Sequence, residues 1–504
     1  MQDKYRASDA RVPELTLGCL DPDSEFYTDS YVCGTSVVFY NLSGANRLSS
    51  VMALVKTLVI VFMLSVSVIV FSKGAETLVI EPIERMINLV TKLAENPLAS
   101  LYKEPGEDDG EQNETSLLEN TLGKISSLLQ VGFGIAGAQI ISSNMSSGGD
   151  LDVMIPGKKI TAVFGFGIME EFTNTCSCLE EEMCTYINTI AKIIHDNSIH
   201  WHGAPNKNIG SAFLLVWKIC DGMMPGMRDL RDAEGKDLTD DEKRELRKDM
   251  FVMSKGKGTE DRRLVPHEMV DSALVSVLKM RVELHEANGL NGTLAEFKKN
   301  QKLVDYYEGK FEVHMGFGLH IGWAIEGAIG STYKIDASYL SPNVNMAARL
   351  EAATHQFGCP MLVSGPFVNE MSPPARALCR KIDVVTVKGS QVPLELWTCD
   401  INNKSDDDCL KCVVPVIENG QQQPINFDLV KGVQKDFSRE FKEVFERGVK
   451  QYVDGDWKAA KEFIDKALTI YGEDGPANSL MRVLQKQNFE APKTWSGFRE
   501  LTSK

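Results

Sequence analysis

The feature that most constrains this chain is an apolar segment at residues 51–72, in which Lys56 is the only charge. Its 22 residues suffice for a helix across a bilayer, which needs about 20. Residues 58–71 are apolar on nearly all helical faces, whereas a helix packed on a soluble core keeps a polar stripe. Fifty residues precede the segment, which argues against a cleaved signal peptide. The sequence therefore predicts one transmembrane helix, with Lys56 reaching towards the interface.

Composition and cysteine placement bound the rest of the chain. A length of 504 residues is too great for one ordinary hydrophobic core, so we expect more than one folded unit. The formal net charge of -16 argues against nucleic-acid partners, although a local basic site can still bind a nucleotide. Nine of the 11 cysteines follow the apolar segment and are dispersed, as expected for reduced thiols. We therefore expect a single-pass membrane protein whose larger part faces the cytosol.

Pattern and composition divide the chain into five regions. These are a short extracytoplasmic or truncated region (1–50), the transmembrane helix (51–72), juxtamembrane helices and a linker (73–158), a domain of alternating strands and helices (159–400) and a helical tail (427–504). Within the domain, residues 221–263 are rich in glycine and charge and are predicted to be a mobile insertion. The tail is similar to one tetratricopeptide-type hairpin, which cannot stack alone, so we expect it to dock on the domain or on a partner.

The periodicity of residues 159–400 predicts a mixed fold. Alternation indicates strands at 160–168, 213–217 and 313–325, and helical spacing indicates helices at 179–195, 268–285 and 343–353. Such an alternation of elements is typical of an α+β or α/β sandwich. We expect its helices to cover one face of the sheet.

Four segments of this domain carry a family resemblance. They read VFGFGIMEEFT (163–173), NKNIGSAFLLVW (206–217), GFGLHIGWAIEG (316–327) and YKIDASYLSPNVNMAAR (333–349). In order and spacing they resemble the catalytic domain of the class III adenylate and guanylate (nucleotidyl) cyclases, over about residues 159–400. The arrangement looks most like the membrane-anchored type of protists and algae. The resemblance implies a ferredoxin-like βαββαβ domain, preceded by one transmembrane helix and followed by a helical hairpin tail.

The resemblance also implies a defect at the metal site. Such cyclases join the ribose 3′-oxygen to the α-phosphate and expel pyrophosphate, with two magnesium ions held by two aspartates. In this sequence the two aspartate positions are Ile168 and Ser211, and neither side chain is a good ligand for a hard cation. We therefore expect Mg²⁺ or Mn²⁺ only where a partner chain supplies its site. Glu170 and Glu171, just after the strand, are the alternative source of a carboxylate.

Other positions keep the residues that the resemblance requires. Lys207 matches the lysine that reads the purine edge, and Asp336 is similar to the purine-selecting acid, a pair that favours adenine over guanine. Asn345 and Arg349 match the residues that orient the ribose and stabilise charge on the phosphates; at i and i+4 they share a helix face. Lys388 resembles a triphosphate-binding lysine. Taken one at a time, three of these residues also have an interpretation without function. Lys207 can be a solvated turn residue, Asn345 can cap a helix, and Arg349 can belong to a surface ion pair.

Three functions remain open from the sequence. Class III sites form between two domains, so this chain can be a half-site that pairs with a metal-bearing cyclase chain and makes cyclic AMP from ATP, with GTP as the alternative nucleotide. It can be a pseudocyclase, a nucleotide sensor or dimerising regulator without turnover. It can also be a homodimeric enzyme in which Glu170 or Glu171 replaces the lost carboxylates. The expected partners are therefore a nucleotide, a second cyclase domain as homo- or heterodimer, and the membrane.

Overall fold

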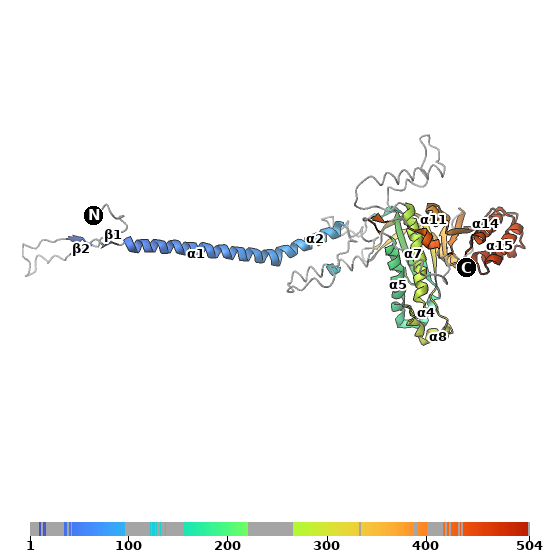
Figure 1. Cartoon of the computed structure of the whole chain (residues 1–504), viewed down its shortest axis with the longest axis horizontal. Helices are drawn as coiled ribbons and strands as arrows, with labels where there is room; N and C mark the ends of the chain where they lie inside the picture. The colour runs from blue at the N-terminus through green and yellow to red at the C-terminus, as the bar shows by residue number, and fades with distance from the viewer. Residues whose placement is uncertain are drawn as a thin grey trace, which may run out of the picture. The chain divides into compact units, whose positions relative to one another are not determined.

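The computed structural model describes residues 43–95, 156–219, 266–331, 334–387, 392–400, 425–431 and 437–501, with short stretches at 10–11, 14–16, 35–37, 40–41, 417–418 and 421–422 and single residues between 121 and 137 and at 434. The chain forms two compact units (Figure 1). One comprises Met1–Thr91 and Lys103–Lys124, and the other Lys92–Tyr102 and Ile125–Lys504. The predicted insertion, most of the predicted N-terminal region and Lys388 lie outside the described residues.

The first unit is dominated by helix. Helix α1 (Ser43–Ala75) passes through one π-helical turn, η3 (Glu76–Ile80), into α2 (Glu81–Glu95). Two small antiparallel pairs precede it: β1 (Ala10–Arg11) with β4 (Tyr40–Asn41), and β2 (Glu14–Thr16) with β3 (Thr35–Val37). Within Asn46–Asn88 the helix is long and apolar enough to cross a membrane, and its apolar side chains are exposed. By length and composition it is compatible with the predicted span.

The second unit is built on one large sheet. Its strands lie in the order β15-β11-β12-β10-β8-β5-β7-β6, and β9 pairs with β8. Their bounds are β5 (Lys158–Met169), β6 (Ala204–Ile209), β7 (Ala212–Ile219), β8 (Met315–Ser331), β9 (Lys334–Leu340), β10 (Met361–Ser364), β11 (Cys379–Thr386), β12 (Leu394–Cys399) and β15 (Arg499–Glu500). The central strands β8, β5, β7 and β6 are antiparallel to one another, whereas β10 pairs with β8 in parallel. The predicted strands 160–168, 213–217 and 313–325 are thus confirmed, each with slightly different ends.

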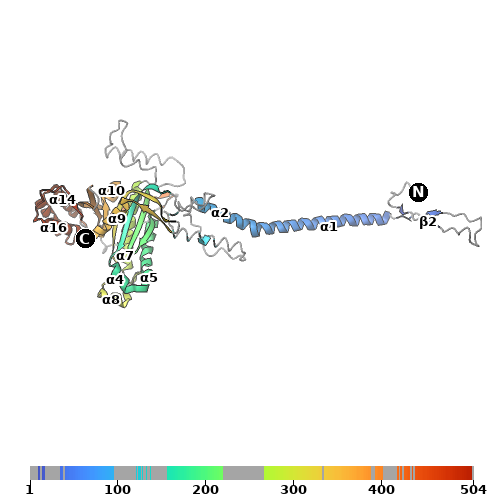
Figure 2. The same cartoon turned by 180° about the vertical axis from the view of Figure 1, so that it is seen from behind.

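Helices cover both faces of this sheet, so the expectation of helices on one face is wrong. On one face α4 (Phe172–Leu179), α5 (Met183–His200) and α7 (Pro266–Ala287) pack over alternate strand residues, among them Val163, Trp217 and Leu319 (Figure 1). On the other face α9 (Pro342–Phe357) packs over Phe164, Leu214 and their neighbours (Figure 2). The shorter elements are η4 (Glu180–Glu182), η5 (Phe297–Lys299), α8 (Gln301–Tyr306), α10 (Gly365–Glu370) and α11 (Pro373–Arg376).

Glycines of β8 allow α9 to approach the sheet closely. A Cβ atom added at Gly318 would lie 2.2 Å from the carbonyl oxygen of Ala347 and 2.5 Å from the backbone nitrogen of Glu351. Both atoms belong to the backbone of α9 and cannot swing aside as a flexible side chain can. The sequence pattern of β8 alone did not reveal this second packed face, because glycines give no hydrophobic signal.

We expect Gly318→Ala to lower the free energy of unfolding by about 1–3 kcal/mol, the usual range for overpacking a core. The reason is that α9 must move away from β8 to admit the methyl group. Urea unfolding followed by circular dichroism measures the change. Gly472→Ala is the matched control, because no atom of the described part of the chain lies within 4 Å of a Cβ at that glycine. Equal stability of the two variants would contradict the close packing of α9.

The C-terminal helices belong to the same compact unit as the sheet. A hairpin of α14 (Arg439–Asp454) and α15 (Trp457–Ile470) is followed by a third helix, α16 (Gly475–Lys486), and by β15, which pairs with β11. The short α13 (Phe427–Lys431) and the pair β13 (Ile417–Glu418) and β14 (Gln421–Gln422) precede them. Apolar residues of these helices share a core with α9, β10, β11 and β12.

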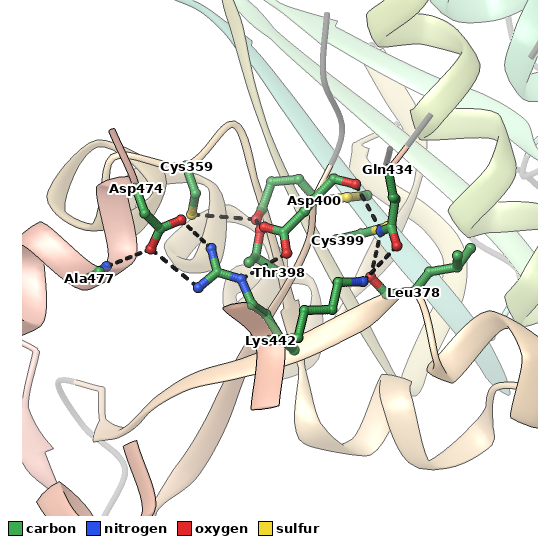
Figure 3. A network of polar contacts seen from close by, with 11 residues as sticks. Cys359, Leu378, Thr398, Cys399, Asp400, Gln434, Lys442, Asp474 and Ala477 are labelled. Atoms are coloured by element: carbon green, nitrogen blue, oxygen red, sulfur yellow. Dashed lines mark hydrogen bonds and ion pairs between the residues drawn. The ribbon is translucent and has the colours of Figure 1, made fainter. Parts of the chain in front are cut away.

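A buried ion-pair network joins the helices to the sheet. Arg380 of β11 is 1% exposed; its Nε donates to Asp400 at 2.7 Å, and its two terminal nitrogens donate to Asp474 (Figure 3). The rings of Phe441 and Phe445 lie 5.1 and 4.3 Å from the guanidinium carbon. Burial opposes the charge on Arg380, but Asp400 and Asp474 outweigh it and raise the pKa of the guanidinium. Arg380 is therefore a charged anchor between β11 and α16.

Candidate functional site

The two predicted metal positions are neighbours at one end of the sheet. Ile168 lies near the end of β5 and pairs with Ala212, and Ser211 lies in the tight turn between β6 and β7. The backbone nitrogen of Met169 donates to the carbonyl oxygen of Ser211 at 2.9 Å. Both side chains are half-buried. Gly210, with φ of 59°, allows the turn that brings them together.

The side chains present here do not fit a divalent metal ion. Isoleucine has no donor atom and a neutral serine hydroxyl is a poor ligand for magnesium. Within the described residues, no group of three or more His, Cys, Asp or Glu side chains is arranged to hold a metal ion. Glu171, one alternative carboxylate, precedes α4 with φ of 54° and accepts a hydrogen bond from Asn174 at 2.5 Å. Glu170, the other, lies 3.9 Å from the imidazole of His355.

The structure brings the two predicted purine-reading residues together. Lys207 lies in strand β6, not in a turn, and its Nζ is 3.4 Å from a carboxylate oxygen of Asp336 on β9. Beside them the amide of Asn206 donates to the carbonyl oxygen of Ala337 at 3.2 Å, which holds β6 against β9. The side chains of Lys207 and Asp336 are 27% and 52% exposed. An ion pair this exposed contributes about 0–1 kcal/mol, so a ligand can displace it at little cost.

The two predicted ribose and phosphate residues share the solvent-facing side of α9. Asn345 and Arg349 are both exposed, one helical turn apart. The cap of this helix is Ser341, whose hydroxyl accepts from the backbone nitrogen of Asn343 at 3.0 Å. Asn345 is therefore not needed as a cap, which removes one ordinary explanation for it. Lys388 lies outside the described residues, so its predicted role stays a prediction.

Sequence reasoning missed a buried acid next to the first metal position. Glu351 of α9 is 2% exposed, and its Oε1 has no hydrogen-bond partner among the residues that the structure describes. That oxygen lies 2.6 Å from the site of a Cβ on Gly316, the residue that pairs with Ile168 across β8 and β5. Burial, with a smaller contribution from Glu170, raises the pKa of Glu351 to about 8. The chain thus keeps a carboxyl group near this end of the sheet that is largely protonated at neutral pH.

We expect the protonation of Glu351 to appear as a pH dependence of stability. The pKa of its carboxyl group is raised from the usual 4.5 to about 8 in the folded protein. Between these two pH values the folded state therefore binds more protons than the unfolded chain. The free energy of unfolding should therefore fall as pH rises from 5 to 8. Glu351→Gln should flatten the profile and stabilise the protein at pH 8 on the order of 1 kcal/mol. Urea unfolding at the two pH values tests this.

The exposed Glu462→Gln supplies the matched control for loss of one negative charge. An unchanged pH profile in the Glu351→Gln protein would show that Glu351 ionises normally. The ionisation of Glu351 concerns the candidate site, because Glu351 lies on α9, the helix that also carries Asn345 and Arg349.

Comparison with known proteins gives partial matches. Residues 42–146 match the family model described as the all-helical domain of RasGEFs. A curated adenylate cyclase of Anabaena cylindrica is 30% identical over 115 residues, which are 23% of this chain and 23% of that protein. The chain therefore aligns with about a quarter of the length of this relative.

Solved structures of cyclases are also similar. A bacterial light-regulated adenylyl cyclase is 18% identical, with a TM-score of 0.36, and the match covers 56% of this chain and 63% of that one. The adenylyl cyclase CyaB from P. aeruginosa is 14% identical, with a TM-score of 0.32, and the match covers 50% of this chain and 98% of that one.

Proposed function

We propose that this chain is a membrane-anchored half-site of the class III nucleotidyl cyclase type, similar to those of protists and algae. In this proposal it supplies the purine, ribose and phosphate contacts, and a metal-bearing cyclase chain supplies the divalent cation. The product is cyclic AMP from ATP. The observation that carries the proposal is the pairing of Lys207 with Asp336 beside a sheet whose metal positions are Ile168 and Ser211.

The chemistry of each contact follows from its side chain. The Lys207 ammonium can donate to a purine nitrogen, while the Asp336 carboxylate can accept from an exocyclic amine, the group that distinguishes adenine from guanine at that edge. On α9, Asn345 can hold a ribose oxygen through its amide, and Arg349 can donate to phosphate oxygens in a bidentate fashion. The 27% exposure of Lys207 leaves its ammonium accessible to such a ligand.

The metal chemistry is assigned to the partner because the donors present here do not fit it. Mg²⁺ or Mn²⁺ held by the partner's carboxylates would polarise the attacking hydroxyl and neutralise phosphate charge. A homodimer of this chain would then bind nucleotide without turnover, which is the pseudocyclase alternative. The two functions differ only in whether an aspartate-bearing partner exists.

The test is a mixing experiment with the full chain reconstituted in lipid nanodiscs. The partner is an aspartate-bearing class III adenylyl cyclase domain whose own purine-reading lysine and ribose-orienting asparagine are replaced by alanine, so that it is inactive alone. We expect cyclic AMP only from the mixture. Binding of ATP without turnover in any mixture would favour the pseudocyclase, and turnover by this chain alone would assign the metal to its own residues.

Lys207→Ala should abolish most of the gain in the mixture, because the adenine then loses its only basic contact among the residues assigned to it. Lys192→Ala, at an exposed position of α5, is the matched control and should leave the turnover of the mixture unchanged. Equal turnover of the two variants would remove Lys207 from the proposed site.

The proposed topology places the second unit in the cytosol, where ATP is available. An epitope at the C-terminal end should be protected from protease in intact cells and digested after permeabilisation. Digestion from outside would overturn this orientation.

A further inference from the structure

Strand β8 presents a nearly bare surface to α9. Side chains alternate between the faces of a strand, so residues 316, 318, 320 and 322 face the helix. Three of these four are glycine, and a Cβ at each would lie 2.2–2.6 Å from an atom of α9. His320 is therefore the one residue of these four that places a side chain under this helix. Glycines permit close approach, but they fix neither the rotation nor the sliding of the helix.

His320 makes hydrogen bonds at both ring nitrogens. Its Nδ1 lies 2.7 Å from the hydroxyl of Ser364, and its Nε2 lies 3.2 Å from the amide oxygen of Asn343, in the first turn of α9. The amide nitrogen of Asn343 donates to the carbonyl oxygen of Trp323 at 2.8 Å, which directs the amide oxygen of Asn343 to the ring. The Nε2–H group of His320 therefore donates to Asn343, and Nδ1 accepts from Ser364.

The ring stays neutral under ordinary conditions. His320 is 6% exposed, and burial lowers its pKa to about 4, against the weaker opposite effect of Asn343. The two groups hydrogen-bonded to the ring belong to Ser364 and Asn343, and neither is charged. One tautomer thus persists across the physiological range, and the contact with α9 does not change with pH there.

We propose that His320 is a positioning residue that sets the rotation of α9 through Asn343 and thereby aims Asn345 and Arg349 at the nucleotide. This inference rests on the proposed function, because it assigns the nucleotide to those two side chains. The ends of side chains lie about 6 Å from a helix axis, so a rotation of roughly 10° moves them by about 1 Å. A displacement of about 1 Å can lower a rate by as much as 10²-fold.

The experiment compares His320→Leu, His320→Gln and Asn343→Ala in the full chain, with His285→Leu at an exposed position of α7 as the matched control. Amide hydrogen exchange of residues 343–349 reports on the helix without any nucleotide. Turnover in the mixture with the metal-bearing partner reports on the site. We expect exchange at least about 10-fold faster and kcat about 10–100-fold lower in His320→Leu and Asn343→Ala, at little change in KM for ATP.

His320→Gln should recover most of both effects, since its amide can still donate to Asn343. A general loss of packing would not be rescued by glutamine and would accelerate exchange outside α9 as well.

Unchanged exchange over residues 343–349 in both disrupting variants overturns the proposal, and so does changed exchange with unchanged kcat in an active mixture. Asn343→Ala leaves the ring bonded to Ser364, so this variant alone decides whether the contact positions α9 if His320→Leu does not fold. An inactive wild-type mixture would overturn the proposed function, while the exchange result would still decide what His320 does for α9.

Discussion

Asp474→Ala is expected to lower the free energy of unfolding by about 3–5 kcal/mol, the usual cost of removing one partner from a buried ion pair. The substitution leaves the charged guanidinium of Arg380 buried against Asp400 alone. It also removes the cap of α16, because a carboxylate oxygen of Asp474 accepts from the backbone nitrogen of Ala477 at 2.8 Å. Urea unfolding of the full chain in detergent, followed by tryptophan fluorescence, measures the loss.

Asp456→Ala is the matched control for the cap alone. Asp456 caps α15 in the same way, accepting from Ala459 at 3.0 Å, but it is exposed and makes no ion pair with a buried cation among the described residues. Its loss should cost about 0.5–2 kcal/mol. The difference between the two variants isolates the contribution of the Arg380 pair. Equal costs would show that Arg380 does not depend on Asp474.

The double substitution Ile168→Asp with Ser211→Asp is expected to give the homodimer a divalent-metal-dependent cyclase activity that the unmutated homodimer lacks. The backbone nitrogen of Met169, the residue after Ile168, donates to the carbonyl oxygen of Ser211 at 2.9 Å, so both carboxylates would stand at one end of the sheet. Loss of one well-placed electrostatic stabiliser costs about 10²–10³ in rate, and two metal ions are absent without the carboxylates. Production of cyclic AMP with Mn²⁺ or Mg²⁺ should rise by at least about 10²-fold.

The control is the double variant with asparagine at both positions, because asparagine is polar but lacks the negative charge that favours binding of a divalent ion. Ile168 is half-buried, so thermal unfolding must first show that each variant folds. Either single aspartate should recover little, because both ions share the two carboxylates. Turnover by the unmutated homodimer equal to that of the double variant would direct attention to Glu170 and the buried Glu351.

Local pattern predicted the strands and helices well, because alternation and helical spacing are short-range signals. The predicted helix 268–285 appears as α7 with ends that differ by about two residues, and the strand 213–217 lies within β7. The predicted helix 179–195 begins later and is preceded by a separate helix, α4, because Glu180 has φ of 47° and interrupts the helical backbone.

Contacts between distant residues were not accessible in the same way. The family resemblance named Lys207 and Asp336 as a purine-selecting pair, and the fold shows that their side chains meet at 3.4 Å. His320 and Glu351 gave no signal, because a histidine among glycines and a glutamate in an amphipathic helix look like ordinary surface residues. Their roles arise from burial under α9. Arg380 was missed for the same reason, as its two carboxylate partners lie 20 and 94 residues away.

The two ends of the large sheet differ in how they discourage association with other chains. Strand β11 would offer a full row of unpaired backbone groups, but the two residues of β15 cover part of it, and the carbonyl of Thr386 accepts from Leu501 at 2.8 Å. A strand as short as β15 is a poor template for further pairing. At the other end β6 carries Pro205, which has no backbone donor. Proteolytic loss of residues after 490 should therefore turn a soluble sheet edge into a site of aggregation.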